Sequence, residues 1–230
     1  MTSRDGVLIS PSIIATDLST LGTAVSSFDP GTVDLLHVDV MDGHFVPNLT
    51  IGPGYIDCLK THTDIPLDVH LMIDNPDSAA AAYIERKPWC VTFHCESTRF
   101  PVRLLRSAAE AGIKPGLSIN PATPVDTLYD LAPYCGLILV MSVEPGFYGQ
   151  AFLDHSLRRI EKLREFLEQN GLGEHCLIQV DGGINERNIA SVVMAGARIV
   201  VAGSAAFTGG DINKNVARLK KSAMERPAQG

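Results

Sequence analysis

Short runs that favour β-structure recur along the chain, separated by segments long enough to hold a helix. Within these segments apolar residues recur at every third or fourth position, which is typical of a helix with one buried face. The segment 154–169 is the clearest, because Leu157, Ile160 and Leu163 form one stripe among charged residues. The pattern predicts strands at 7–10, 34–40, 66–71, 90–94, 114–119, 136–141, 177–180 and 198–203, and helices at about 18–28, 103–111, 154–169 and 186–195.

This regular alternation predicts a closed barrel. Strands that alternate with helices form parallel sheets. Eight such repeats in 230 residues fit a (β/α)8 barrel, or TIM barrel, at the compact end of its size range. No linker rich in serine or proline divides the chain, so we expect a single domain over 1–230. An open doubly wound sheet is the structural alternative.

The second predicted strand carries polar residues in the otherwise apolar run LLHVDVM. Side chains alternate across a strand, so His37 and Asp39 share one face. The third strand repeats the pattern with Asp68 and His70. Barrel active sites form at the carboxyl ends of the strands, so these faces converge on one mouth. The residues at the strand ends are Ser10, His37, Asp39, His70, His94, Ser118, Asn120, Met141, Asp181, Gly203 and Ser204.

Four of these end residues, His37, Asp39, His70 and Asp181, are of types that bind metal ions. Burying them unpaired would be costly. One divalent cation removes that cost, because imidazole and carboxylate bind zinc, iron, manganese or cobalt. The alternative is that each inward histidine is a hydrogen-bonded core residue.

Three further polar residues lie close by in the sequence. Asp68 lies one layer deeper than His70, which favours a structural or supporting role. His44 falls in a loop and is expected to be solvated. His94 points inward, and both contact with substrate and a core role remain open for it.

Three glycine-rich stretches follow neighbouring strands: PGFYGQ (145–150), DGGIN (181–185) and VAGSAAF (201–207). Barrels bind phosphate after their last strands through backbone N–H groups. Glycines also occur in ordinary turns and caps, but three adjacent stretches favour a phosphate site. Together with the quartet, they suggest a phosphorylated sugar whose proton is removed by one carboxylate and returned by another, while a metal ion stabilises the enediolate.

The net charge excludes some classes of binding partner, and the cysteine content indicates the cellular compartment. A net charge of −7 argues against nucleic acid or an anionic membrane surface as partner. Five cysteines without a CxxC pair predict buried thiols in a reducing compartment. No signal-peptide pattern opens the chain, and no apolar run approaches the roughly 20 residues of a membrane span. These features predict a cytoplasmic protein.

The motifs together resemble the ribulose-phosphate 3-epimerase family over nearly the whole chain. The string HVDVMDGHFVPNLTIGP (37–53) is highly specific, and the other matching stretches stand at the expected places. They are ISPSI (9–13), PLDVHLMI (66–73), NPATP (120–124), MSVEPGF (141–147), VDGGIN (180–185) and VAGSA (201–205).

The resemblance implies an isomerase of the pentose phosphate pathway that interconverts D-ribulose 5-phosphate and D-xylulose 5-phosphate. By that resemblance, Asp39 and Asp181 are the paired acid and base, and His37, Asp39, His70 and Asp181 hold the metal. The segment Pro145 to Gln150 would be a lid, and the chain would form homo-oligomers. Substrate contacts would come from Ser10, His70, Met41, Met72, Met141, Gly146, Phe147, Tyr148, Gly149, Gly182, Gly183, Gly203 and Ser204. The three methionines have an alternative role as core filler.

One departure stands out: Tyr148 occupies a position where the family usually has glycine. A positive φ there would strain a tyrosine. Among rivals, a D-allulose-6-phosphate 3-epimerase shares the quartet but tends to read VDGSCN and VGTSG. Related barrel decarboxylases place a lysine where His70 stands. A catalytically silent phosphosugar-binding barrel would be expected to lose a quartet member, and metal storage would call for a histidine-rich tract.

Overall fold

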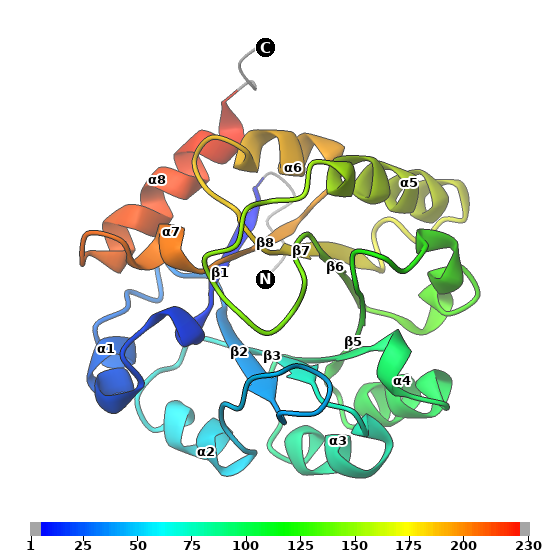
Figure 1. The fold of residues 1–230 in the computed structure, drawn as a ribbon, viewed down its shortest axis with the longest axis horizontal. Coiled ribbons are helices and arrows are strands. Elements are labelled where there is room, and N and C mark those ends of the chain that lie inside the picture. The colour runs from blue at the N-terminus through cyan, green and yellow to red at the C-terminus, as the bar shows by residue number, and fades with distance from the viewer. Residues whose placement is uncertain (1–5, 226–230) are drawn as a thin grey trace.

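The computed structural model describes residues 6–225, and in it eight parallel strands form one barrel (Figure 1). Each strand pairs in sequence with the next from β2 to β8, and β8 pairs with β1. A parallel bridge between Ser12 and His37 joins β1 to β2 and brings the ring close to closure. The strands are β1 (Leu8–Pro11), β2 (Leu36–Met41), β3 (Leu67–Met72), β4 (Cys90–His94), β5 (Lys114–Ile119), β6 (Leu137–Met141), β7 (Leu177–Asp181) and β8 (Ile199–Ala202).

Helices surround the barrel as an outer ring (Figure 1). The connection between β5 and β6 is the exception, because it holds two 3-10 turns and no α-helix. Pro121, Pro124 and Pro133 interrupt that connection, and proline removes the N–H that a helix needs. The α-helices are α1 (Leu21–Ser26), α2 (Gly54–Lys60), α3 (Pro76–Ile84), α4 (Pro101–Glu110), α5 (His155–Gln169), α6 (Ile189–Ala195), α7 (Ser204–Phe207) and α8 (Ile212–Met224). The 3-10 turns are η1 (Ile13–Ala15), η2 (Leu18–Thr20), η3 (Cys95–Ser97), η4 (Val125–Leu128) and η5 (Ala132–Tyr134).

The barrel separates two kinds of interior. Outward strand residues such as Val38 and Val69 are fully buried and belong to the large apolar layer shared with the helices. Inside the barrel, the β6 and β8 side is apolar, with Leu139 and Ile199 in one cluster. The opposite side of the interior is polar. The fully buried polar residues there are Ser10, His37, Asp68, His70, Thr92, His94 and Ser118, and Gln179 of β7 reaches Asp68 from the other side.

The predicted fold class is confirmed, and each predicted strand agrees with the observed one to within two residues. The prediction of one domain over 1–230 includes termini, 1–5 and 226–230, that lie outside the described residues. Across residues 6–225, no helix combines the length and the apolar character that crossing a bilayer would require.

All five cysteines are free. Cys90, Cys135 and Cys176 are buried as expected, whereas Cys95 is half-buried and Cys58 is exposed on α2, so the prediction of buried thiols is wrong for those two.

Candidate active site

The register of β2 and β3 stacks the site residues in layers. His37 pairs with Asp68, Asp39 pairs with His70, and Met41 pairs with Met72. Because alternate residues of both strands point inward, the three pairs rise step by step toward the carboxyl end of the barrel. Two adjacent strands therefore supply both imidazoles and one of the carboxylates.

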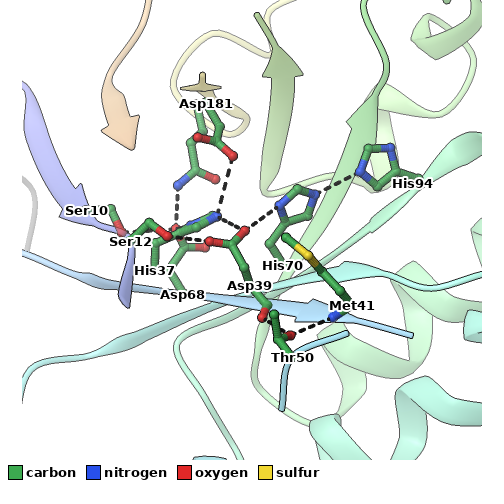
Figure 2. Close-up of polar contacts among 11 residues, drawn as sticks. Ser10, Ser12, His37, Asp39, Met41, Thr50, Asp68, His70, His94 and Asp181 are labelled. Atoms are coloured by element: carbon green, nitrogen blue, oxygen red, sulfur yellow. Dashed lines mark hydrogen bonds and ion pairs between the residues drawn. The ribbon is translucent and has the colours of Figure 1, made fainter. Parts of the chain in front are cut away.

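The four predicted ligand residues meet at this end (Figure 2). One nitrogen or oxygen from each of His37, Asp39, His70 and Asp181 lies within 4.8 Å of the others. Oδ1 of Asp39 is 3.3 Å from Nε2 of His37 and 3.4 Å from Nδ1 of His70. Oδ2 of Asp181, across the barrel on β7, is 3.9 Å from Nε2 of His37.

The donor set fits a divalent cation. Nε2 of His37 and Nδ1 of His70 are buried and have no hydrogen-bond partner. These are the two nitrogens that face the carboxylates of Asp39 and Asp181. A buried polar atom without a partner is costly, and two imidazole nitrogens beside two carboxylates are good ligands for zinc, manganese, iron or cobalt.

Below the quartet, Asp68 fixes His37. Its Oδ2 lies 2.7 Å from Nδ1 of His37 and accepts hydrogen bonds from the Ser10 hydroxyl at 3.2 Å and from the Gln179 amide. A carboxylate on Nδ1 places the ring proton there and leaves Nε2 free to bind a metal ion. The supporting role predicted for Asp68 agrees with this position.

The structure places Ser10 differently from Ser12. Ser10 is fully buried beneath the quartet, bonded to Asp68, and does not line the cavity above it. Ser12 does line the cavity, and its hydroxyl donates a hydrogen bond to Oδ2 of Asp39. Sequence reasoning missed Ser12, although it shares a strand face with Ser10, because the first strand was predicted to end at residue 10.

The two carboxyl groups have opposite electrostatic surroundings. Burial alone would raise the pKa of Asp39, but the imidazoles of His37 and His70 hold that pKa well below its ordinary value. Burial raises the pKa of Asp181 to about 7, with His37 opposing the rise and Asp39 adding to it. Paired acids whose pKa values are pushed apart are suited to divide the roles of base and acid.

Above the carboxylates lies a cavity at the carboxyl end of the barrel. Asp39 and Asp181 form part of its lining, whereas His37 and His70 lie behind them. The loop between β6 and α5 passes across the open end of the barrel (Figure 1). Of the other predicted contacts, those that line the cavity are Met41, Met72, Met141, Gly146, Phe147, Tyr148, Gly149, Gly182, Gly183, Gly203 and Ser204.

Glycine is required where the loop after β6 meets the loop after β7. Gly183 has φ +65°, and a Cβ there would lie 2.4 Å from the backbone nitrogen of Phe152. Tyr148, by contrast, is not strained: the one non-glycine residue with positive φ in the described part of the chain is Lys87. The Tyr148 side chain is 62% exposed, with its Cβ 4.0 Å from where a Cβ on Gly203 would stand.

His94 does not line the cavity. It is fully buried behind His70, with 2.9 Å between their Nε2 atoms (Figure 2). His44 is exposed, as predicted.

Arg159 on α5, which sequence reasoning also missed, donates hydrogen bonds to the carbonyl groups of Asn120, Thr123 and Met141. It thereby ties together the ends of β5 and β6. One arginine among the several charged residues of a predicted helix gives no signal of this role.

Fold and site together define a barrel enzyme with its polar centre at the carboxyl ends of the strands. Two solved structures share the fold. A 3-hexulose-6-phosphate synthase aligns with TM-score 0.65 and 16% identity over 94% of this chain and 99% of that chain. Orotidine 5'-phosphate decarboxylase from Pyrococcus horikoshii aligns with TM-score 0.67 and 13% identity over 95% and 100%.

Closer relatives specify the enzyme family. The model of the ribulose-phosphate 3 epimerase family matches residues 8–207. Ribulose-phosphate 3-epimerase from Mycobacterium bovis is 44% identical over 96% of this chain and 95% of its own length, and that from Bacillus subtilis is 37% identical over 94% and 99%. The chain therefore belongs to the ribulose-phosphate 3-epimerase family, and it is an isomerase that acts on carbohydrates.

Proposed function

We propose that this enzyme interconverts D-ribulose 5-phosphate and D-xylulose 5-phosphate by moving the proton at C3 through an enediolate. The observation that carries the proposal is the pairing of Asp39 and Asp181 in one cavity, on strands from opposite sides of the barrel. Family membership supports the same reaction class, because curated relatives with full-length similarity are named ribulose-phosphate 3-epimerase.

The two aspartates act as a reversible acid and base. In one direction Asp39 takes the C3 proton from one face of the sugar and Asp181 supplies a proton to the other face. The Ser12 hydroxyl and the two imidazoles fix the carboxylate of Asp39, so its position does not have to be organised when substrate binds. The reverse reaction exchanges the roles.

His37, Asp39, His70 and Asp181 would hold one divalent metal ion, whose chemistry is to stabilise the negative charge that develops on the sugar oxygens. Asp68 orients His37 for this purpose through Nδ1. Met41, Met72 and Met141 line the cavity and would keep water away from the reacting carbons.

The phosphate would bind at the opposite end of the cavity. Gly182, Gly183, Gly203 and Ser204 present backbone there, and Gly203 immediately precedes helix α7. The loop 145–150 would act as a lid. Gln150 braces that loop by donating to the carbonyl groups of Glu144 at 2.6 Å and Phe147 at 2.9 Å. Homo-oligomer formation and a cytoplasmic location stay predictions.

Proton NMR of D-ribulose 5-phosphate in heavy water tests the proposal. Wild-type, metal-replete enzyme should produce the xylulose isomer with solvent deuterium at C3. Asp39→Asn should abolish the signal, whereas the matched Asp64→Asn change, on the exposed surface before β3, should leave it unchanged. If the wild type gives neither exchange nor isomer, the pentulose assignment is wrong, and conversion of D-allulose 6-phosphate in the same assay would identify the six-carbon substrate instead.

A further inference from the structure

Glu96, in the 3-10 turn after β4, is anchored in one orientation. Its Oε1 accepts hydrogen bonds from the backbone N–H of Asn120 at 2.7 Å and from the hydroxyl of Thr123. Arg159 holds the carbonyl groups of the same two residues, at 2.7 Å and 3.1 Å. Two hydrogen bonds from the segment after β5, which Arg159 of α5 braces in turn, therefore determine which oxygen of Glu96 faces which neighbour.

The second oxygen of Glu96 faces the barrel interior. Oε2 lies 3.4 Å from Nδ1 of His94, and Nε2 of His94 lies 2.9 Å from Nε2 of His70. His94 and His70 are fully buried, which favours neutral rings with one N–H each. Nδ1 of His94 has no hydrogen-bond partner among the described residues, but the nearby carboxylate accepts and does not donate, so its negative charge favours the His94 proton on Nδ1. Nε2 of His94 then accepts, and Nε2 of His70 must donate.

We propose that Glu96 is a positioning residue that acts through His94 to keep the proton of His70 on Nε2, so that Nδ1 of His70 is free to bind the metal ion. Nδ1 lies 3.4 Å from Oδ1 of Asp39 and has no hydrogen-bond partner in the described part of the chain, so Asp39 attracts the same ring proton and the Glu96–His94 contact must outweigh it. His37 is set by Asp68 through one direct contact, whereas His70 is set by a carboxylate two steps away. The inference rests on the metal-binding role proposed above for the quartet.

The anchoring of Glu96 makes one substitution diagnostic. In Glu96→Gln the side-chain carbonyl stays with the donors of Asn120 and Thr123, which leaves the NH2 group facing Nδ1 of His94. That group donates, so the His94 proton moves to Nε2 and the His70 proton moves to Nδ1. The result is an N–H where the metal ion should bind. Glu96→Ala removes the acceptor without imposing the reversed order.

The test is zinc affinity of metal-free protein, measured by competition with a chromophoric chelator, together with long-range proton–nitrogen NMR of the His70 ring. Wild type should show the Nε2–H form. Glu96→Gln should show Nδ1–H and bind zinc about 10–100-fold more weakly, and Glu96→Ala should lie between them. Glu110→Gln, an exposed change on α4, should match wild type in both measurements.

The outcomes separate this inference from the proposed function. An Nδ1–H form of His70 in metal-free wild type overturns the inference without any variant, including the case in which Glu96→Gln fails to fold. Zinc affinity of Glu96→Gln within twofold of wild type also overturns it. If wild type binds no zinc, iron, manganese or cobalt, the proposed metal site fails instead, and the NMR result still decides the His70 proton.

Discussion

The two sides of the barrel mouth are built by different means. On the side of β2 and β3, reactive side chains stand on strands, and each is held by a neighbouring side chain, as Asp68 holds His37. On the side of β6, β7 and β8, loops rich in glycine line the cavity, and the glycines let these loops approach one another, as Gly183 approaches Phe152. Contacts on the first side fix the orientation of individual imidazole and carboxylate groups. Close packing on the second side fixes the shape of the cavity wall. Substitutions on the two sides should therefore fail in different ways.

The largest effect is expected where the two sides meet, at Asp181. Asp181→Asn removes one of the two proton-transfer groups, so interconversion should fall by more than about 10³-fold, toward the upper range for one acid–base group. Because Asp39 still faces the sugar, any residual deuterium exchange at C3 should be confined to one of the two epimers. NMR of each epimer in heavy water measures this. Interconversion within tenfold of wild type would contradict the assignment of Asp181.

On the loop side, substitution of a glycine should lower stability through backbone strain and a steric clash. Gly183→Ala forces a left-handed residue, at about 1–2 kcal/mol, and a clash with Phe152, at about 1–3 kcal/mol. Gly171→Ala is the matched control, because Gly171 has φ +69° but nothing lies within 4 Å of its added Cβ. Urea unfolding should therefore show a larger stability loss for Gly183→Ala than for the control. Equal losses would mean that the close approach between the two loops does not matter.

Next to the strand side, Glu96 in the turn after β4 should make the stability of the protein sensitive to acid. Burial alone would raise the pKa of Glu96, but contacts with His94, Thr123 and Asn120 bring it to about 2. The pKa is lowered on folding, so the stabilisation is complete above the ordinary value of about 4.5 and disappears as the pH falls toward 2. The contribution of the Glu96 carboxylate to the free energy of unfolding is at most about 3 kcal/mol, and screening by solvent reduces it further.

Glu96→Gln provides the comparison for that acid sensitivity. The stability difference between wild type and Glu96→Gln, measured by urea unfolding from pH 7 down to pH 3, should shrink as the pH falls. A difference that stays constant over this range would show that the Glu96 carboxylate does not contribute through its charge.

The smallest effect is expected at Tyr148, on the loop side. Its side chain is largely exposed and its backbone avoids the left-handed region, so Tyr148→Gly should change stability by no more than about 0.5 kcal/mol. Thermal unfolding checks this value. We expect KM for the sugar phosphate to change by less than about threefold, and an increase beyond tenfold would mean that the ring contacts substrate.

The difference between site residues on strands and site residues in loops also explains which features the sequence could predict. Two-residue alternation along β2 and β3 predicted that His37, Asp39 and His70 face the barrel interior together, and the strand ends brought Asp181 to them. The positions of Ser10 and Ser12 depend on where β1 ends, which periodicity defines poorly. Loop conformations and the contacts of Glu96 and Arg159 depend on residues far apart in the chain, so no local pattern carries them.

The in-register pairing of β2 and β3 also limits how such a site can change over evolutionary time. Deleting one residue within β2 would exchange the positions of His37 and Asp39 with those of Val38 and Val40, and would turn both polar groups into the apolar layer. The metal and proton-transfer side can therefore diverge by substitution but not by changes in length. The loops beyond β6 and β8 have no two-residue alternation to preserve, so a residue inserted there does not turn the polar groups of β2 and β3 away from the site.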